Sequence, residues 1–253
     1  MGYGPEVLGL PAGVTLCLFD LDGVLTQTAT LHARAWKQMF DDYLRGRAAA
    51  TGADLPPFDA TVDYQQYVDG KPRADGVRSF LASRGIELPE GRPDDPPDAA
   101  TINGLGNRKN AIVLDMIRRD GVDPYDGSVR YVKAARDGGL RCGVVSSSAN
   151  CREVLAAAGI ADLFEEIIDG RVAEREHLKG KPAPDTYLAG ARAAGVAPQR
   201  AAVFEDALAG VEAGRAGKFA IVVGVDRLGQ ADALRAHGAD IVVRDLAELL
   251  DVP

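Results

Sequence analysis

Two carboxylates, Asp20 and Asp22, follow a short apolar segment near the start of the chain. The segment 14–19 is typical of a strand buried on both faces, and Gly23 allows a tight turn directly after it. Ligands of open α/β sheets bind beyond the carboxyl ends of the strands. Two adjacent carboxylates repel each other unless a cation lies between them, and hard oxygen ligands suit Mg²⁺. These residues therefore indicate a magnesium site, although Asp-Gly is also a common turn dipeptide.

Three further segments carry polar side chains after an apolar run or at the start of a predicted helix: Ser146–Asn150, Lys181–Asp185 and Glu205–Asp206. The hydroxyl and N–H groups of Ser146–Asn150 would bind an anion or simply cap a helix. The lysine stands beside stiff prolines and would direct its charge at a phosphoryl oxygen or extend into solvent. The acidic pair would complete a metal site or favour a helix N-terminus. In this order, the segments jointly predict one site at one edge of a sheet.

Strands and helices alternate after residue 120, and this alternation would bring the polar segments together. Apolar runs predict strands at 140–145, 201–204, 219–223 and 241–243, and helices at 128–136, 149–158, 184–194, 207–216 and before the last strand. Between residues 29 and 120 only helical periodicity is found, with helices at 31–44, 73–84 and 107–119, a frayed helix end and a loop over 45–57, and an exposed loop at 91–100. We therefore expect an α/β fold. Its doubly wound, mostly parallel, Rossmann-like core would comprise residues 1–28 and 121–253, with a helical cap domain, residues 29–120, inserted after the first strand.

Composition excludes several other classes of protein. The chain has 253 residues, is 46% hydrophobic and has a net charge of −8, so nothing indicates a nucleic acid or an anionic membrane as partner. No apolar run approaches the roughly 20 residues that cross a bilayer, and no signal peptide is recognisable. Three cysteines without zinc or disulfide spacing favour the cytoplasm. Gly104 and Gly106 do not form a dinucleotide-binding motif, because the third glycine of that motif is missing. We expect a monomer that binds a small molecule.

The four polar segments resemble the four motifs of the haloacid dehalogenase-like phosphotransferase superfamily, over nearly the whole chain. Additional residues match its β-phosphoglucomutase branch: Thr28, His32, Trp36, Gly70–Arg73, Lys109, Asn110, Ser148 and Asn150. The chain departs from that branch in a longer cap, at 45–57 and 92–100, and in the residues up to Gly13. We expect these additions to be surface loops.

The resemblance implies phosphoryl transfer to Asp20 as an aspartyl-phosphate, with Asp22 as general acid and base. Ser146 and Lys181 would hold the transferring phosphoryl oxygens. Mg²⁺ would bind Asp20, Asp206 and the backbone carbonyl of Asp22, with Glu205 close by. The resemblance thus gives the metal set as Asp20, Asp22, Glu205 and Asp206.

A mutase needs a second phosphate site, and the guanidinium of Arg73 suits it unless that side chain is merely solvated. Ser148 and Asn150 from the core, and Lys109 and Asn110 from the cap, would complete it, and Thr28 and Gly70 join this substrate-binding set by resemblance. His32 would either align Asp22 or have a structural role. We expect Trp36 to pack in the protein interior and not to contact the substrate. A sugar-phosphate phosphatase is the alternative function, followed by a non-catalytic sugar-phosphate sensor. The sequence leaves the exact sugar and anomer open.

Overall fold

The computed structural model describes residues 5–250, which form two compact units. The first unit runs up to Gln27 and resumes at Val122, and the second is Thr28–Gly121. The chain therefore crosses twice between the units, close to residues 28 and 120, where the sequence places the limits of the cap.

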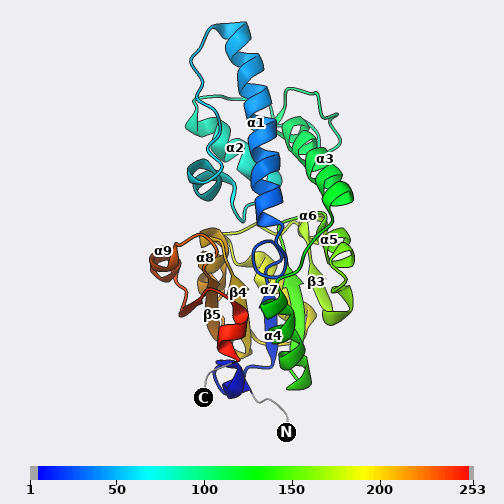
Figure 1. The fold of residues 1–253 in the computed structure, drawn as a ribbon, viewed down its shortest axis with the longest axis vertical. Helices are drawn as coiled ribbons and strands as arrows, with labels where there is room; N and C mark the ends of the chain where they lie inside the picture. The colour runs from blue at the N-terminus through cyan, green and yellow to red at the C-terminus, as the bar shows by residue number, and fades with distance from the viewer. Residues whose placement is uncertain (1–4, 251–253) are drawn as a thin grey trace. The chain divides into compact units, whose positions relative to one another are not determined.

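The first unit is built on a six-stranded parallel sheet (Figure 1). In spatial order its strands are β3 (Glu166–Ile168), β2 (Arg141–Val145), β1 (Leu16–Phe19), β4 (Ala201–Glu205), β5 (Ile221–Val225) and β6 (Ile241–Val243). The strand order reverses beside β1, where Leu16 is in register with Arg141 on one side and Ala201 on the other. The carboxyl ends of β1, β2 and β4 consequently meet at one edge, as expected for a doubly wound α/β fold.

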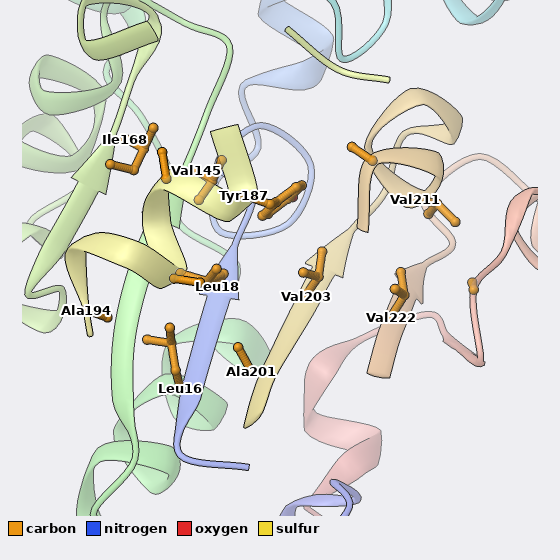
Figure 2. Packing of buried hydrophobic residues seen from close by; sticks show 14 of the residues in the cluster. Leu16, Leu18, Val145, Ile168, Tyr187, Ala194, Ala201, Val203, Val211 and Val222 are labelled. Atoms are coloured by element: carbon orange, nitrogen blue, oxygen red, sulfur yellow. The ribbon is translucent and has the colours of Figure 1, made fainter. Parts of the chain in front are cut away.

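Helices cover both faces of this sheet. They are α4 (Asp126–Asp137), α5 (Cys151–Ala157), α6 (Gly170–Arg175), α7 (Asp185–Ala193), α8 (Leu208–Ala216) and α9 (Ala231–His237). On one face Leu16 and Leu18 belong to the same core cluster as Tyr187 of α7, part of which Figure 2 shows. On the other, Phe19 stacks on Phe204 with ring centroids 4.4 Å apart, and Tyr131 of α4 meets both rings edge-on. Burial on both sides explains why the strands read as continuous apolar runs.

The second unit is helical and has its own core. It contains α1 (Ala29–Thr51), the π-helical turn η2 (Tyr64–Val68), α2 (Arg73–Ser83) and α3 (Ile102–Asp120). Phe40 lies at the centre of this core, with ring centroids 4.1 Å from Phe80, 5.3 Å from Phe58 and 5.2 Å from Trp36. All of residues 28–121 are described and none forms a strand, as predicted. Across residues 5–250, no helix combines the length and apolarity that spanning a membrane would require.

Two predicted helix limits are wrong. The first helix does not end near residue 44 but continues to Thr51, because Ala48–Ala50 are strong helix formers and the break comes only at Gly52, with φ of 70°. The third helix begins at Ile102 rather than 107, because the Thr101 hydroxyl accepts a hydrogen bond from the Gly104 amide at 2.9 Å and caps it.

The segment before Gly13 is not the surface loop that the sequence predicts. Pro5–Leu8 forms a 3₁₀ turn, η1, and both Leu8 and Leu10 are buried. The hydroxyl of Tyr131 donates to the Leu8 carbonyl at 2.8 Å. This extension therefore packs against α4 and closes the end of the sheet core opposite the polar edge.

Candidate active site

The four segments predicted to form one site do meet at the carboxyl edge of the sheet. Asp20 directly follows β1, and its amide donates to the Phe204 carbonyl at 2.9 Å. Ser146 follows β2, and its amide donates to the Ile168 carbonyl, also at 2.9 Å. Glu205 ends β4 and Lys181 precedes α7, so four separate stretches of sequence supply one buried polar cluster.

Lys181 is the centre of this cluster. Its Nζ donates to Asp20 Oδ1 at 2.5 Å, to Glu205 Oε1 and to the Val145 carbonyl at 3.2 Å. Burial by itself would lower the pKa of this lysine, but the charges of Asp20 and Glu205 outweigh that effect and raise it. Lys181 therefore remains a cation inside the protein, placed between two carboxyl groups, and is not the solvated lysine of the alternative interpretation.

Glu205 is held by donors on both of its carboxylate oxygens. Besides Lys181, the hydroxyl of Tyr187 donates to Oε1 at 3.0 Å, and the amide of Ala207 donates to Oε2 at 3.0 Å. A Cβ on Gly210 of α8 would lie only 1.7 Å from Oε1, so the glycine makes room for this carboxylate. Sequence reasoning missed Tyr187, because a buried tyrosine on an amphipathic helix cannot be distinguished from an ordinary core residue.

The carboxylates in this cluster suit a divalent metal. Oxygens of Asp20, Glu205 and Asp206 lie within 4.8 Å of one another, and all three residues are buried. With all three carboxylates ionised, one ammonium would leave two negative charges, which is the charge that one divalent ion neutralises. Burial raises the pKa of Asp20 well above its ordinary value; Lys181 opposes this, and Glu205 and Asp22 add to it. The cluster therefore has hard oxygen donors of the kind that a divalent metal ion binds.

Gly23 shows how closely the backbone approaches the carboxylate cluster. Its φ is 89°, and a Cβ there would lie 1.8 Å from Asp206 Oδ2. Only glycine fits both restrictions. Asp22 is half-buried, and its side chain is not among the three carboxylates gathered above. The resemblance implies that it offers its backbone carbonyl to the metal.

The serine-rich segment after β2 is braced by its own hydroxyls. Ser146 Oγ accepts from the Ser148 amide at 3.1 Å, and Ser148 Oγ accepts from the Asn150 amide at 3.1 Å. Having accepted one bond each, both hydroxyls can still donate their own protons. The side chain of Asn150 makes no capping bond to α5, so this segment is not simply a helix cap.

Three of the predicted cap residues lie together in the second unit. Lys109 of α3 is buried, with Nζ 2.8 Å from Nδ1 of His32 and 4.8 Å from the ring centroid of Trp36. Because an ammonium can only donate, Nδ1 is the acceptor in this pair. Trp36 is 3% exposed and belongs to the core of its unit, which favours packing over contact with a substrate.

Arg73 opens α2 and points its Nη2 at Asn107 Oδ1, 3.0 Å away. Its stem lies over Gly106 of α3, where a Cβ would come 3.3 Å from Arg73 Cγ. Gly70 precedes the helix with a φ of 69°. Thr28 is buried beside α1, and Asn110 is half-buried on α3. These residues all belong to the second unit, whereas the Lys181 cluster belongs to the first.

A family model described as haloacid dehalogenase-like hydrolase matches residues 14–218. The chain belongs to this family. Within it, the chain falls in the β-phosphoglucomutase branch: it is 59% identical to a Mycobacterium bovis protein named beta-phosphoglucomutase, over 97% of this chain and 95% of that protein. A Bacillus subtilis protein of the same name is 33% identical over 92% and 90% of the two chains.

A solved structure supports the fold. The beta-phosphoglucomutase of Clostridium difficile superposes with a TM-score of 0.72 and covers 93% of each chain at 24% sequence identity. The family match and the 59% identity to the Mycobacterium bovis protein show that this chain is an enzyme of the phosphotransferase and phosphatase class.

Proposed function

We propose that this enzyme is a β-phosphoglucomutase that interconverts β-glucose 1-phosphate and glucose 6-phosphate. The observation that carries the proposal is the 59% identity to a protein of that name along almost the full length of both chains. The buried cluster of Asp20, Glu205, Asp206 and Lys181 supports it, because phosphoryl transfer depends mainly on positioning and charge neutralisation.

In the proposed reaction, a carboxylate oxygen of Asp20 attacks phosphorus, and the bond from phosphorus to the sugar oxygen breaks. Asp22 gives a proton to the departing oxygen and later removes one from the attacking hydroxyl. Lys181 and the Ser146 hydroxyl hold the phosphoryl oxygens, while Glu205 keeps Lys181 in place. Mg²⁺ bound by Asp20, Asp206 and the Asp22 carbonyl would neutralise the charge of the nucleophile and of the phosphoryl group.

Isomerisation further requires that a sugar bisphosphate present each of its ends to Asp20 in turn. One phosphate must therefore be bound away from the nucleophile during each half-reaction. We assign this second phosphate site to Arg73, whose guanidinium can donate two parallel hydrogen bonds to one phosphate. Further donors would come from Asn110, Lys109, Ser148 and Asn150. Thr28, Gly70 and His32 complete the proposed set.

The decisive experiment is ³¹P NMR of the purified protein with Mg²⁺, β-glucose 1-phosphate and a trace of the glucose bisphosphate. A mutase converts the substrate resonance into that of glucose 6-phosphate. Stoichiometric release of orthophosphate without glucose 6-phosphate would instead identify a sugar-phosphate phosphatase.

Replacing Arg73 tests the second phosphate site separately. We expect Arg73→Ala to lower isomerase turnover on the order of 10²-fold or more while leaving hydrolysis of a simple phosphate ester unchanged. Arg78→Ala is the matched control, because Arg78 lies on the same helix but is exposed and pairs with Asp75 and Glu90. Equal losses in both assays would show that Arg73 supports the fold of α2 and not the second phosphate.

A further inference from the structure

The loop between β5 and α9 holds two backbone carbonyls of the metal-site segments. Arg227 Nε donates to the Gly23 carbonyl at 2.8 Å, and Gln230 Nε2 donates to the Asp206 carbonyl at 3.1 Å. Gly23 and Asp206 are the two residues that approach each other so closely that a Cβ on the glycine would meet the carboxylate at 1.8 Å. The loop thus binds both sides of this contact.

Arg227 is itself firmly anchored. Its Nη1 donates to the Arg244 carbonyl at 2.7 Å, and an Asp245 oxygen lies 3.6 Å away. The guanidinium carbon sits 3.6 Å from the ring centroid of Tyr125, which presents a flat face to a flat cation. The side chain is only 15% exposed. A surface arginine in a flexible loop would have none of this support.

The loop is fixed at both of its ends as well. The Asp226 amide donates to the Val243 carbonyl of β6 at 2.7 Å, and Asp226 Oδ1 accepts from the Gln230 amide at 2.7 Å. The contacts of Arg227 and Gln230 therefore link the metal-site segments to the sheet through short, defined hydrogen bonds.

Tyr125 connects the same arginine to the point where the chain re-enters this unit. Its amide donates to the Leu25 carbonyl at 2.9 Å, and the Gln27 amide donates to the Asp123 carbonyl at 2.9 Å. Arg227 consequently bridges the segment that leaves the unit after Gly23 and the segment that returns before Tyr125.

We propose that Arg227 and Gln230 are positioning residues for the metal site, an inference that rests on the proposed metal-dependent function. They fix the peptide planes that follow Gly23 and Asp206, and so constrain the separation of the neighbouring oxygens that would bind the ion. Neither side chain touches the reacting atoms. A metal site tolerates shifts of only about 0.2 Å in its ligands, and partners that orient ligands typically contribute 10–100-fold to metal affinity.

The test is the affinity of the substrate-free protein for Mn²⁺, followed by the EPR signal of the free ion. Gln230→Met keeps the length of the side chain and removes its donors, and Arg227→Met keeps an unbranched aliphatic stem and removes the guanidinium. We expect each to weaken Mn²⁺ binding about 10-fold. The Mg²⁺ concentration for half-maximal turnover should rise in proportion, while kcat at saturating Mg²⁺ approaches the wild-type value.

The direction of the change separates positioning from simple electrostatics. A positive charge near an acidic cluster repels a cation, so loss of the Arg227 charge by itself would tighten Mn²⁺ binding. Arg235→Met is the control: Arg235 is exposed on α9, pairs with Asp232 at 3.2 Å and makes no contact described above with the site. It should leave the Mn²⁺ affinity unchanged.

Unchanged or tighter Mn²⁺ binding in both variants, with thermal unfolding in EDTA like that of the wild type, would overturn the proposal. If Arg227→Met does not fold, Gln230→Met decides alone, since it removes one half-buried side-chain donor. A wild-type protein that binds Mn²⁺ but does not isomerise glucose phosphate would contradict the proposed function and leave this inference standing.

Discussion

Lys181 and its two carboxylate partners form an arrangement that would be unfavourable almost anywhere else in a protein. Each ion loses its hydration on burial, and the mutual attraction repays this only if further hydrogen bonds satisfy the remaining oxygens. Tyr187 and the Ala207 amide supply such bonds to Glu205. Asp20 has fewer, and burial together with its acidic neighbours raises its pKa. The same shortage of positive charge that disfavours Asp20 as an anion makes it a good place for a metal ion.

Tyr187 offers a test of this balance at a single hydroxyl. Burial raises the pKa of Tyr187 well above its ordinary value, so the hydroxyl stays protonated and donates to Glu205. Removing it in Tyr187→Phe leaves a buried carboxylate with one donor fewer. We expect the free energy of unfolding to fall by about 1.5–3 kcal/mol, as for a hydrogen bond to a charged group, measured by urea denaturation.

Tyr131→Phe is the matched comparison for that experiment. Tyr131 is equally buried, but its hydroxyl donates to a neutral acceptor, the Leu8 carbonyl, at 2.8 Å. Its loss should cost only about 1 kcal/mol and leave turnover unaffected. A Tyr187→Phe variant no less stable than Tyr131→Phe would show that the hydrogen bond to Glu205 contributes no more than one to a neutral acceptor.

At the level of elements, helix α8 is shaped by the carboxylate beneath it. Alanine in place of a helical glycine normally stabilises a protein by about 0.5–1 kcal/mol. At Gly210 the new methyl group would lie 1.7 Å from Glu205 Oε1, so the carboxylate and Lys181 must move. We predict that Gly210→Ala destabilises the protein by roughly 1–3 kcal/mol and lowers turnover.

Gly46→Ala serves as the control for this prediction, because Gly46 is exposed in α1 and a Cβ there meets nothing within 4 Å. That substitution should stabilise the protein by about 0.5–1 kcal/mol. Urea unfolding and steady-state turnover of both variants make the comparison. A stabilised and fully active Gly210→Ala variant would mean that Glu205 has more room than the structure indicates.

The elements differ in how far the sequence could predict them. The strands β1, β2 and β4 were predictable because they are buried on both faces and so form apolar runs, and the polar residues after them could be placed at one edge by the strand rule alone. β3 was missed because it contains only two apolar residues, whereas β6, which is equally short, is apolar throughout and was predicted. α6 was missed because a helix of six residues has too little periodicity to detect.

The parts of the site that escaped prediction depend on tertiary packing. Tyr187 reaches Glu205 only because α7 packs against the sheet at one particular rotation, which no local pattern specifies. Arg227 and Gln230 lie in a loop with no recognisable motif, and their partners are backbone carbonyls far away in sequence. Residue types that bind ligands can be identified in a sequence, whereas residues that hold backbone carbonyls cannot.

At the scale of the whole molecule, each unit has a hydrophobic core of its own, and each core contains residues that can report on its unfolding. The single tryptophan, Trp36, lies in the core of the second unit, with 3% of its surface exposed. The three cysteines, Cys17, Cys142 and Cys151, are free and buried in the first unit. Tryptophan fluorescence therefore reports the unfolding of one unit and thiol labelling that of the other.

These probes test whether the metal stabilises only the unit that binds it. A ligand at 100 times its Kd raises the unfolding free energy of the state that binds it by about 2.7 kcal/mol. In urea titrations with Mg²⁺ at that level, we expect pulsed thiol labelling to shift to higher urea while the Trp36 fluorescence midpoint stays in place. Asp206→Asn, which removes a ligand oxygen, should abolish the shift. A fluorescence midpoint that moves together with the thiols would show that the two cores unfold as one cooperative body, and a thiol midpoint that does not move would place the metal outside the Asp20–Asp206 cluster.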